Sequence, residues 1–234
     1  MIQPNRGLTP WSLLLAVLMS WGLMACSDSD KKSEPSAQTP PPQAETPKQP
    51  QVPYEPPPSG LLENGDFAVA NRGVPVGWSF QQHANTSSFT IAVDDGVVKI
   101  ARIGTEPWGV LRQSFRRGAV EPLLGKTLEF SAEIAGEFNE EYGEPMEPPG
   151  LTVRVRGVRA GSPAMLGAST LLTASETLDT TSGYLPWRRY TLRFALPDAD
   201  KVRGVDFDLG ILMTMGGEMR VRGASLQVVE TDAE

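Results

Sequence analysis

Short segments in which polar and apolar residues alternate make up most of the chain after residue 61. Strict alternation is typical of β-strands with one face in a core and the other in water. The clearest alternating segments are residues 127–134, 151–155, 190–196 and 205–209. Further strands are predicted at residues 78–83, 89–93, 97–103, 108–115 and 219–228.

Turn-forming residues separate these segments, and no segment has a sustained helical period. Asp94-Asp95-Gly96, between two predicted strands, is a good hairpin turn. Nine or more strands within about 170 residues predict an all-β domain, a two-sheet antiparallel jelly-roll sandwich over residues 61–230. Residues 231–234 form an acidic tail.

The first 25 residues have the pattern of a signal peptide. Arg6 precedes an apolar run at residues 13–19, which is too short to span a bilayer comfortably. Leu23-Met24-Ala25-Cys26 resembles the bacterial lipobox. The resemblance implies that the chain is cleaved before Cys26 and that Cys26 carries fatty acyl chains such as palmitate. Cys26 would then anchor the chain in a membrane. An ordinary signal peptide with a chance cysteine is the alternative.

Residues 26–60 are predicted to comprise the lipidated cysteine and a disordered proline-rich linker. Ten prolines fall between residues 27 and 60, with almost no apolar side chains among them. Such a segment cannot offset its ordering entropy and favours polyproline II conformations. We expect it to act as a spacer, and a ligand for a proline-reading domain is the alternative.

Composition excludes several classes of function. The chain has one Cys, which excludes a disulfide framework and CxxC metal sites. It has one His, His83, which excludes multi-histidine zinc and iron sites. The net charge of −7 argues against a nucleic-acid partner, which would need a basic surface.

Several motifs resemble, in order, those of carbohydrate-binding modules of families 4 and 9, which are galactose-binding-domain-like jelly rolls. The matching stretches are 62–67 (LENGDF), 75–78 (PVGW), 108–115 (WGVLRQSF), 125–133 (GKTLEFSAE) and 186–190 (PWRRY). The resemblance covers most of residues 61–229 and implies a jelly roll that binds a carbohydrate without catalysis.

The last strand departs from the family pattern. Arg222 and Gly223 stand where the family usually has the acidic pair that helps to hold a structural calcium. A guanidinium there would repel the cation. The sequence therefore predicts no cofactor and no metal site. A structural calcium bound by Glu63 and Asp66 is the alternative.

Sugar recognition needs an aromatic surface for the ring and planar polar groups for the hydroxyls. The resemblance places the binding cleft around the strand that holds Trp108, Arg112 and Gln113, which are the main candidates. Further ligand-binding candidates are Tyr142, Tyr184 and Trp187. Structural packing is the alternative for both tryptophans.

Arginine outnumbers lysine after residue 61, and several arginines share a strand face. The same-face arginine pairs are Arg154 with Arg156, Arg189 with Arg193, and Arg220 with Arg222. The same-face acidic pairs are Glu129 with Glu133, and Asp206 with Asp208. We expect cross-strand ion-pair ladders. An arginine-lined face that grips the carboxylates or sulfates of an acidic polysaccharide is the alternative.

Catalysis is not expected. The loop at residues 137–149 holds five glutamates, but carboxylates on one flexible loop are poorly positioned for glycoside hydrolysis. The sequence thus predicts a non-enzymatic lipoprotein that binds an oligo- or polysaccharide at the cell envelope. Ser27, rather than Asp, follows Cys26, which favours the outer membrane over the inner membrane.

The alternative is a scaffold or protein-interaction lipoprotein that uses the same fold with an envelope protein as its partner. Its mark would be that Trp108 and Trp187 are both buried and that no aromatic-lined groove exists.

Overall fold

The computed structural model describes residues 54–84, 87–163, 167–179 and 182–230. The predicted signal peptide, Cys26, most of the predicted linker and the acidic tail at 231–234 lie outside the described residues. In the described part of the chain, no helix is long and apolar enough to cross a membrane.

Strands dominate the described residues. The first half contains β1 (Ala70–Asn71), β2 (Val74–Pro75), β3 (Ser79–Gln82), β4 (Phe89–Asp94), β5 (Val97–Arg102) and β6 (Gly109–Phe115). The helical turns α1 (Arg117–Val120) and η1 (Glu121–Leu123) follow. The second half contains β7 (Thr127–Asn139), β8 (Gly150–Arg159), β9 (Ser169–Thr177), β10 (Gly183–Ala195), β11 (Val202–Met213) and β12 (Gly216–Val229).

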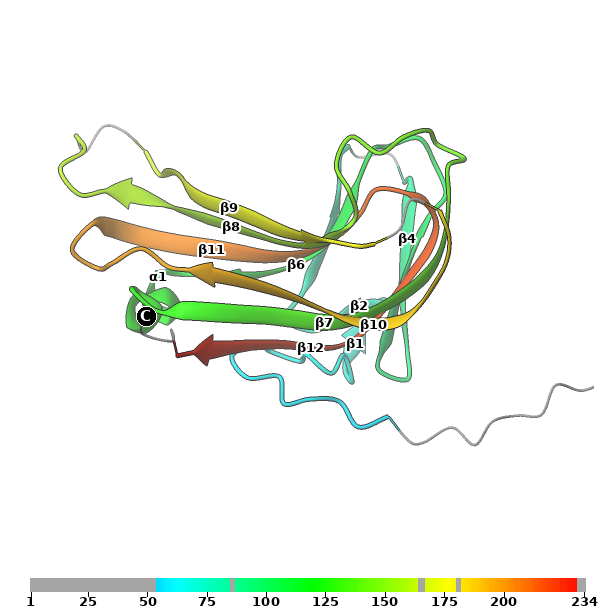
Figure 1. Ribbon diagram of the computed structural model, residues 1–234, viewed down its shortest axis with the longest axis horizontal. Coiled ribbons are helices and arrows are strands. Elements are labelled where there is room, and N and C mark those ends of the chain that lie inside the picture. Colours follow the sequence, from blue (N-terminus) through cyan, green and yellow to red (C-terminus); the bar gives the residue numbers. More distant parts are fainter. Residues whose placement is uncertain (1–53, 85–86, 164–166, 180–181, 231–234) are drawn as a thin grey trace, which may run out of the picture. The chain divides into compact units, whose positions relative to one another are not determined.

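The strands form two antiparallel five-stranded sheets and a small β1–β2 ribbon. Sheet I has the order β10-β7-β12-β5-β4, and sheet II has the order β3-β6-β11-β8-β9. The long strands of the two sheets lie in two facing layers (Figure 1). The predicted two-sheet antiparallel sandwich of the jelly-roll class is therefore confirmed.

Apolar side chains from alternating positions fill the space between the sheets. Phe194 of sheet I meets Phe207 of sheet II edge to face, with 6.0 Å between ring centroids. Phe207 in turn stacks on Phe115, a neighbour in sheet II, at 4.5 Å. Complete burial of a side chain of this size contributes on the order of 1.5–3 kcal/mol. The inward rows of each strand thus hold the sandwich together and leave the outward rows for other roles.

The hairpin predicted from Asp94-Asp95-Gly96 is confirmed. β4 and β5 pair from Asp94 opposite Val97, and the two central turn residues are left-handed, with φ 47° at Asp95 and 70° at Gly96. Such turns match the twist of the flanking strands. β9, by contrast, was not predicted from the sequence. It is an edge strand rich in serine and threonine with mostly exposed side chains, so its apolar alternation is faint.

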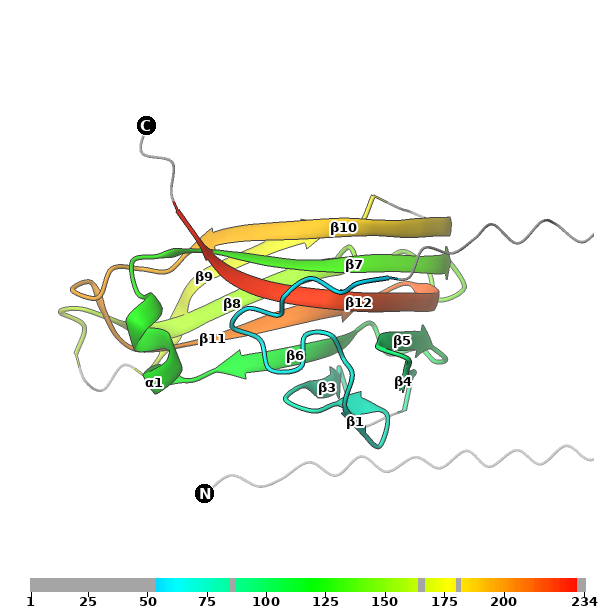
Figure 2. The ribbon, with the colours of Figure 1, turned by 90° about the horizontal axis from the view of Figure 1, so that it is seen from below.

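The folded unit begins before residue 61, where the domain boundary was predicted. Segment Tyr54–Gly60 runs beside β12 of sheet I (Figure 2). Leu226 donates its N–H to the Ser59 carbonyl at 3.2 Å, and its own carbonyl accepts from the Leu61 N–H at 2.8 Å. The Ser225 hydroxyl donates to the Pro58 carbonyl at 2.7 Å. A proline-rich segment lacks N–H donors but keeps its carbonyl acceptors, and the sheet uses these.

Candidate functional site

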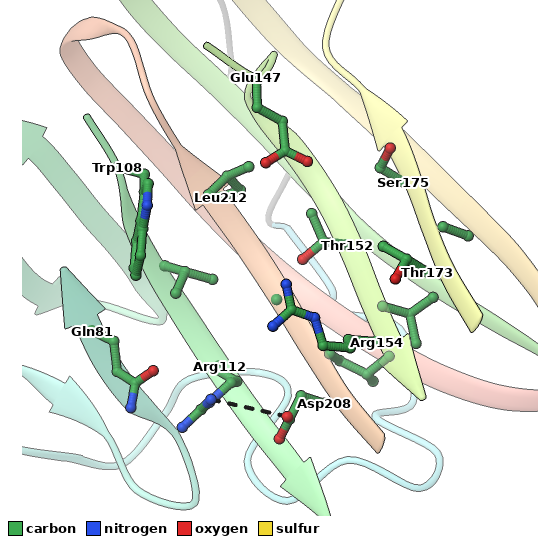
Figure 3. A pocket seen from close by; sticks show the side chains of 15 residues that line it. Gln81, Trp108, Arg112, Glu147, Thr152, Arg154, Thr173, Ser175, Asp208 and Leu212 are labelled. Atoms are coloured by element: carbon green, nitrogen blue, oxygen red, sulfur yellow. Dashed lines mark ion pairs between the residues drawn. The ribbon is translucent and has the colours of Figure 1, made fainter. Parts of the chain in front are cut away.

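A groove of about 260 Å³ lies on the outer face of sheet II. All five strands of the sheet contribute to its lining, and Glu147 of the β7–β8 loop joins them at the rim (Figure 3). Trp108 stands on one side of the groove, and Thr173 and Ser175 of β9 stand on the other (Figure 3). The groove therefore offers an aromatic ring facing a row of hydroxyl groups.

The hollow of the groove depends on a glycine in the central strand. Gly210 of β11 lies in register between Arg112 of β6 and Thr152 of β8. A Cβ atom at Gly210 would come within 2.5 Å of the Thr152 hydroxyl and 2.9 Å of a Val110 methyl group. Because β11 has no side chain here, the flanking side chains form walls and the backbone forms the floor.

Trp108 supplies the aromatic side of the groove and is only partly buried. It immediately precedes β6, and Val110 and Leu212 continue the apolar lining beside it. The His83 ring packs against Trp108 edge to face at 5.8 Å, and His83 Nδ1 lies 2.7 Å from a Glu106 carboxylate oxygen. These contacts orient the indole while leaving it exposed to the groove. The scaffold alternative requires a buried Trp108 and no aromatic-lined groove. The partly exposed Trp108 and the groove beside it differ from both requirements.

Two arginines bring charge into the groove. Arg112 Nη1 lies 3.9 Å from an Asp208 carboxylate oxygen, and Arg112 Nε is buried with no hydrogen-bond partner among the described residues. Asp208 also accepts a hydrogen bond from the Ser114 hydroxyl. Arg154 is exposed, and within the described ranges it has neither a hydrogen bond nor an ion pair. The groove thus contains guanidinium donors that the protein itself does not satisfy.

Gln113, a main candidate from the sequence, does not reach the groove. It is 5% exposed and points to the inner side of sheet II, in phase with Leu111 and Phe115. Its amide donates to the Glu63 carbonyl at 2.9 Å and accepts from the Glu63 N–H at 3.1 Å. The prediction that Gln113 binds ligand is corrected. The side chain instead fixes the turn that precedes β1.

The other three aromatic candidates lie away from the groove. Tyr184 and Trp187 belong to β10, in sheet I, whereas the groove is on sheet II. Tyr184 is 71% exposed. Tyr142 lies in the β7–β8 loop, where its ring covers the guanidinium of Arg102 at 4.7 Å. Of the six predicted ligand-binding residues, the structure brings only Trp108 and Arg112 together.

Arg102 itself is a structural anchor. It is mostly buried, and its guanidinium donates to the carbonyls of Gly104, Thr105 and Thr214. Burial lowers the pKa of Arg102 from its ordinary value. Since Tyr142 packs on this anchored cation, its ring is held by the fold rather than presented to a ligand.

The outer face of sheet I carries the predicted ion-pair ladder. Glu133 of β7 accepts from Arg222 Nε of β12 at 2.9 Å and from Arg189 of β10 at 3.4 Å. Glu129 accepts from Arg193 Nε at 2.7 Å. Cross-strand pairing of oppositely charged side chains is confirmed on this sheet.

Arg222 is also held between two aromatic rings. Its guanidinium carbon lies 3.7 Å from the centroid of Tyr54 and 4.2 Å from that of Trp187. Such contacts are worth roughly 0.5–2 kcal/mol. Burial, followed by the negative charge of Glu133, raises the pKa of Tyr54 above its ordinary value. Trp187 therefore has a structural partner.

Metal binding has little support in the described residues. Among them, no group of three or more His, Cys, Asp or Glu side chains could hold a metal ion. Asp66, one of the two candidate calcium ligands, accepts a hydrogen bond from the Ala68 N–H at 3.3 Å within its own turn. Glu63 and Asp66 alone would offer too few oxygens for the six to eight ligands that Ca²⁺ takes.

By sequence, no family model and no curated protein matches this chain. By structure, it is similar to a carbohydrate-binding module of family 4, at 14% identity and a TM-score of 0.41, over 72% of this chain and 99% of that one. It is also similar to the Stig cyclase Fisc from Fischerella sp. TAU, at 9% identity and a TM-score of 0.44, over 73% of this chain and 97% of that one.

A third similar structure is the enzymatically active domain of tailspike protein 4 from bacteriophage CBA120. The identity is 9% and the TM-score 0.42, and the match spans 73% of this chain but only 22% of the tailspike. A carbohydrate-binding module, a cyclase and an enzymatically active domain thus match this chain with similar TM-scores. These likenesses assign neither a family nor a function, and the resemblance to families 4 and 9 stays a prediction.

Proposed function

We propose that this protein is a non-catalytic carbohydrate-binding lipoprotein, and that the groove on sheet II is its binding surface. The observation that carries the proposal is that an accessible Trp108 and the guanidinium groups of Arg112 and Arg154 line one hollow of the sheet. An indole face packs against the apolar face of a sugar ring, and a guanidinium donates to hydroxyl or acid oxygens.

The hydroxyl side chains on the far side of the groove fit the same ligand. Thr152, Thr173 and Ser175 line the groove opposite Trp108 (Figure 3). Each hydroxyl both donates and accepts, so this wall can exchange hydrogen bonds with sugar hydroxyls in either direction. Within the described residues the groove holds two separate carboxylates, Glu147 on a loop and Asp208 on β11, and Asp208 is engaged by Ser114 and Arg112. This arrangement favours binding over hydrolysis.

A survey of the full chain, purified in mild detergent, against immobilised neutral and acidic glycans tests the proposal. We expect retention on at least one glycan, and Trp108→Ala should weaken it by at least about thirtyfold, as loss of an aromatic hot spot does. Trp187→Ala is the matched control, because it removes the same side chain from the opposite sheet. Equal weakening by both variants, or no retention by the unaltered chain, would contradict the proposal.

The anchor is a separate part of the same proposal and is supported by the sequence around Cys26. Cys26→Ser should move the protein from the membrane fraction to the soluble fraction and abolish labelling by radioactive palmitate. Labelling that persists in the variant would contradict lipidation at Cys26. Sucrose-gradient separation of inner and outer membranes would test the proposed outer-membrane location.

A further inference from the structure

The outer face of sheet II is richer in positive charge than the chain as a whole. The protein carries a net charge of −7. On this face, β6, β8 and β11 and the residue after β6 contribute four arginines and two aspartates, namely Arg112, Arg116, Arg154, Arg156, Asp206 and Asp208. An excess of guanidinium groups on one face of an acidic protein raises the local concentration of anions there.

Both aspartates of this face are engaged from one side. Asp208 accepts from the Ser114 hydroxyl and pairs with Arg112, both on β6. Asp206 accepts from the Arg117 N–H at 2.9 Å and lies 3.7 Å from Arg116. Both carboxylates therefore pair toward the β6 side of β11, away from β8.

As a result, neither aspartate pairs with the two arginines of β8. Arg154 lies opposite Asp208 in register, and Arg156 lies opposite Asp206, yet neither forms an ion pair within the described ranges. Residues two apart on a strand are separated by roughly 6.6 Å, so the two guanidinium groups form a short row. The oppositely charged residues of β8 and β11 therefore form no ion-pair ladder among the described residues.

Only one of these two arginines lies in the groove. Arg154 lies opposite Thr173 of β9 and lines the groove together with Arg112 (Figure 3). Arg154 is exposed without a hydrogen bond or ion pair in the described ranges, and the guanidinium group of Arg112 lines the same hollow. Unpaired donors in a groove match a ligand that supplies several acceptor oxygens at one point.

We propose that the sugar bound in this groove is acidic, and that Arg154 is the residue that binds its carboxylate or sulfate group. The inference rests on the proposed function, because Trp108 must hold the ring for Arg154 to meet its acid group. A guanidinium binds two oxygens of a carboxylate or sulfate in parallel, which an ammonium does not match. Glu147 at the rim repels the acid group and so favours the orientation in which it faces Arg154.

The test compares polymers that differ only in charge, using the full chain in mild detergent and isothermal titration calorimetry. Polygalacturonate and its fully methyl-esterified form probe the carboxylate, and dextran sulfate and dextran probe the sulfate. Polyglutamate is the anionic polymer without sugar. Salt is kept at about 0.15 M, where exposed charges beyond about 8 Å are screened.

We expect at least one acidic polymer to bind about tenfold tighter than its neutral counterpart and than polyglutamate. Arg154→Gln should abolish that preference, and Arg154→Lys should recover it only in part. Arg193→Gln removes the same charge from the exposed face of sheet I and should leave binding unchanged, which excludes a general charge effect. The preferred pair of polymers identifies the acid group.

Each other outcome overturns a defined part of the argument. Equal binding of acidic and neutral polymers, or an unchanged preference in Arg154→Gln, refutes the acidic ligand and leaves the proposed function standing. Polyglutamate binding as tight as that of the acidic glycans also refutes it, because the sugar then contributes nothing. Binding of no polymer of either kind refutes the proposed function and the inference together.

Discussion

The outer faces of sheets I and II carry the same kinds of side chain but satisfy them differently. On sheet I, Glu133 accepts from two arginines, and Arg222 lies between two aromatic rings. On sheet II, Arg154 has no partner within the described residues, and Arg112 keeps a buried donor unused. Polar groups that satisfy one another stabilise a fold, whereas an exposed group such as Arg154 that stays unpaired is available to a ligand.

The same contrast distinguishes the tryptophans. Trp187 covers a guanidinium that is also hydrogen-bonded to Glu133, so its ring is part of a closed cluster. Trp108 is oriented by His83 but borders an open groove. A tryptophan on the outer side of a sheet thus has a binding or a structural role according to whether its neighbours leave a hollow beside it.

Among the variants that test the contrast between the two outer faces, Glu133→Gln is expected to have the largest effect. The change removes the charge shared by Arg189 and Arg222 at a position where the carboxylate is only 21% exposed. The free energy of unfolding should fall by about 1.5–3 kcal/mol, as for hydrogen bonds to charged groups, while glycan binding stays unchanged. Denaturant titration measures the first quantity and calorimetry the second.

Glu129→Gln is the matched control, because Glu129 accepts from Arg193, a 70% exposed side chain. Its cost should stay below about 1 kcal/mol. Equal losses for the two variants would show that the cluster around Glu133 is no more than a surface ion pair.

A smaller effect is expected from Gly210→Ala, which fills the floor of the groove. The new methyl group would crowd the Thr152 hydroxyl and a Val110 methyl group. Both groups belong to β-branched side chains that must shift, so the variant should lose some stability. The glycan affinity of the folded variant should fall about tenfold, or roughly 1.4 kcal/mol. Gly118→Ala is the control, because a Cβ at Gly118 meets no atom within 4 Å. Unchanged affinity in Gly210→Ala would place the ligand outside the groove.

The smallest effect is expected from Tyr54→Phe and appears only at high pH. Burial and Glu133 raise the pKa of Tyr54 above 10.0, so the folded state holds the phenol proton more tightly than the unfolded chain does. The resulting stabilisation is complete below pH 10 and is lost as pH rises through the folded-state pKa. Above about pH 10, the unaltered protein should therefore lose stability more steeply with rising pH than the variant. Identical slopes would show that Tyr54 is as solvated when folded as when unfolded.

Local patterns in the sequence predicted the strands and one of the ladders. Alternation located four of the strands, and five further predicted segments also match strands. The shared faces of Glu129, Glu133, Arg189 and Arg193 led to the pairing seen on sheet I. The same rule could have corrected Gln113. It stands in phase with Leu111 and Phe115, so alternation already places it on the inner face.

Strand order could not be predicted in the same way. Trp187 and Trp108 each follow a proline in the sequence, yet their strands belong to different sheets. Arg154 was recognised as part of a same-face pair, but the side to which Asp208 turns depends on Ser114 and Arg112 of another strand. Contacts between residues far apart in the chain determine both outcomes, and no single segment records them. Glu147 was missed as a site residue for the same reason.

The last two strands of the chain occupy the centre of the two sheets. β11 lies between β6 and β8, and β12 lies between β7 and β5. Without them, the remaining strands of the two sheets form four separate pairs, β4–β5, β7–β10, β3–β6 and β8–β9. A nascent chain therefore exposes unpaired strand edges until residues 202–229 leave the ribosome, and neither the groove nor the closed cluster exists before then. Synthesis of the whole domain precedes its folding, and a chain halted after residue 201 would be a target for aggregation or proteolysis rather than a smaller sandwich.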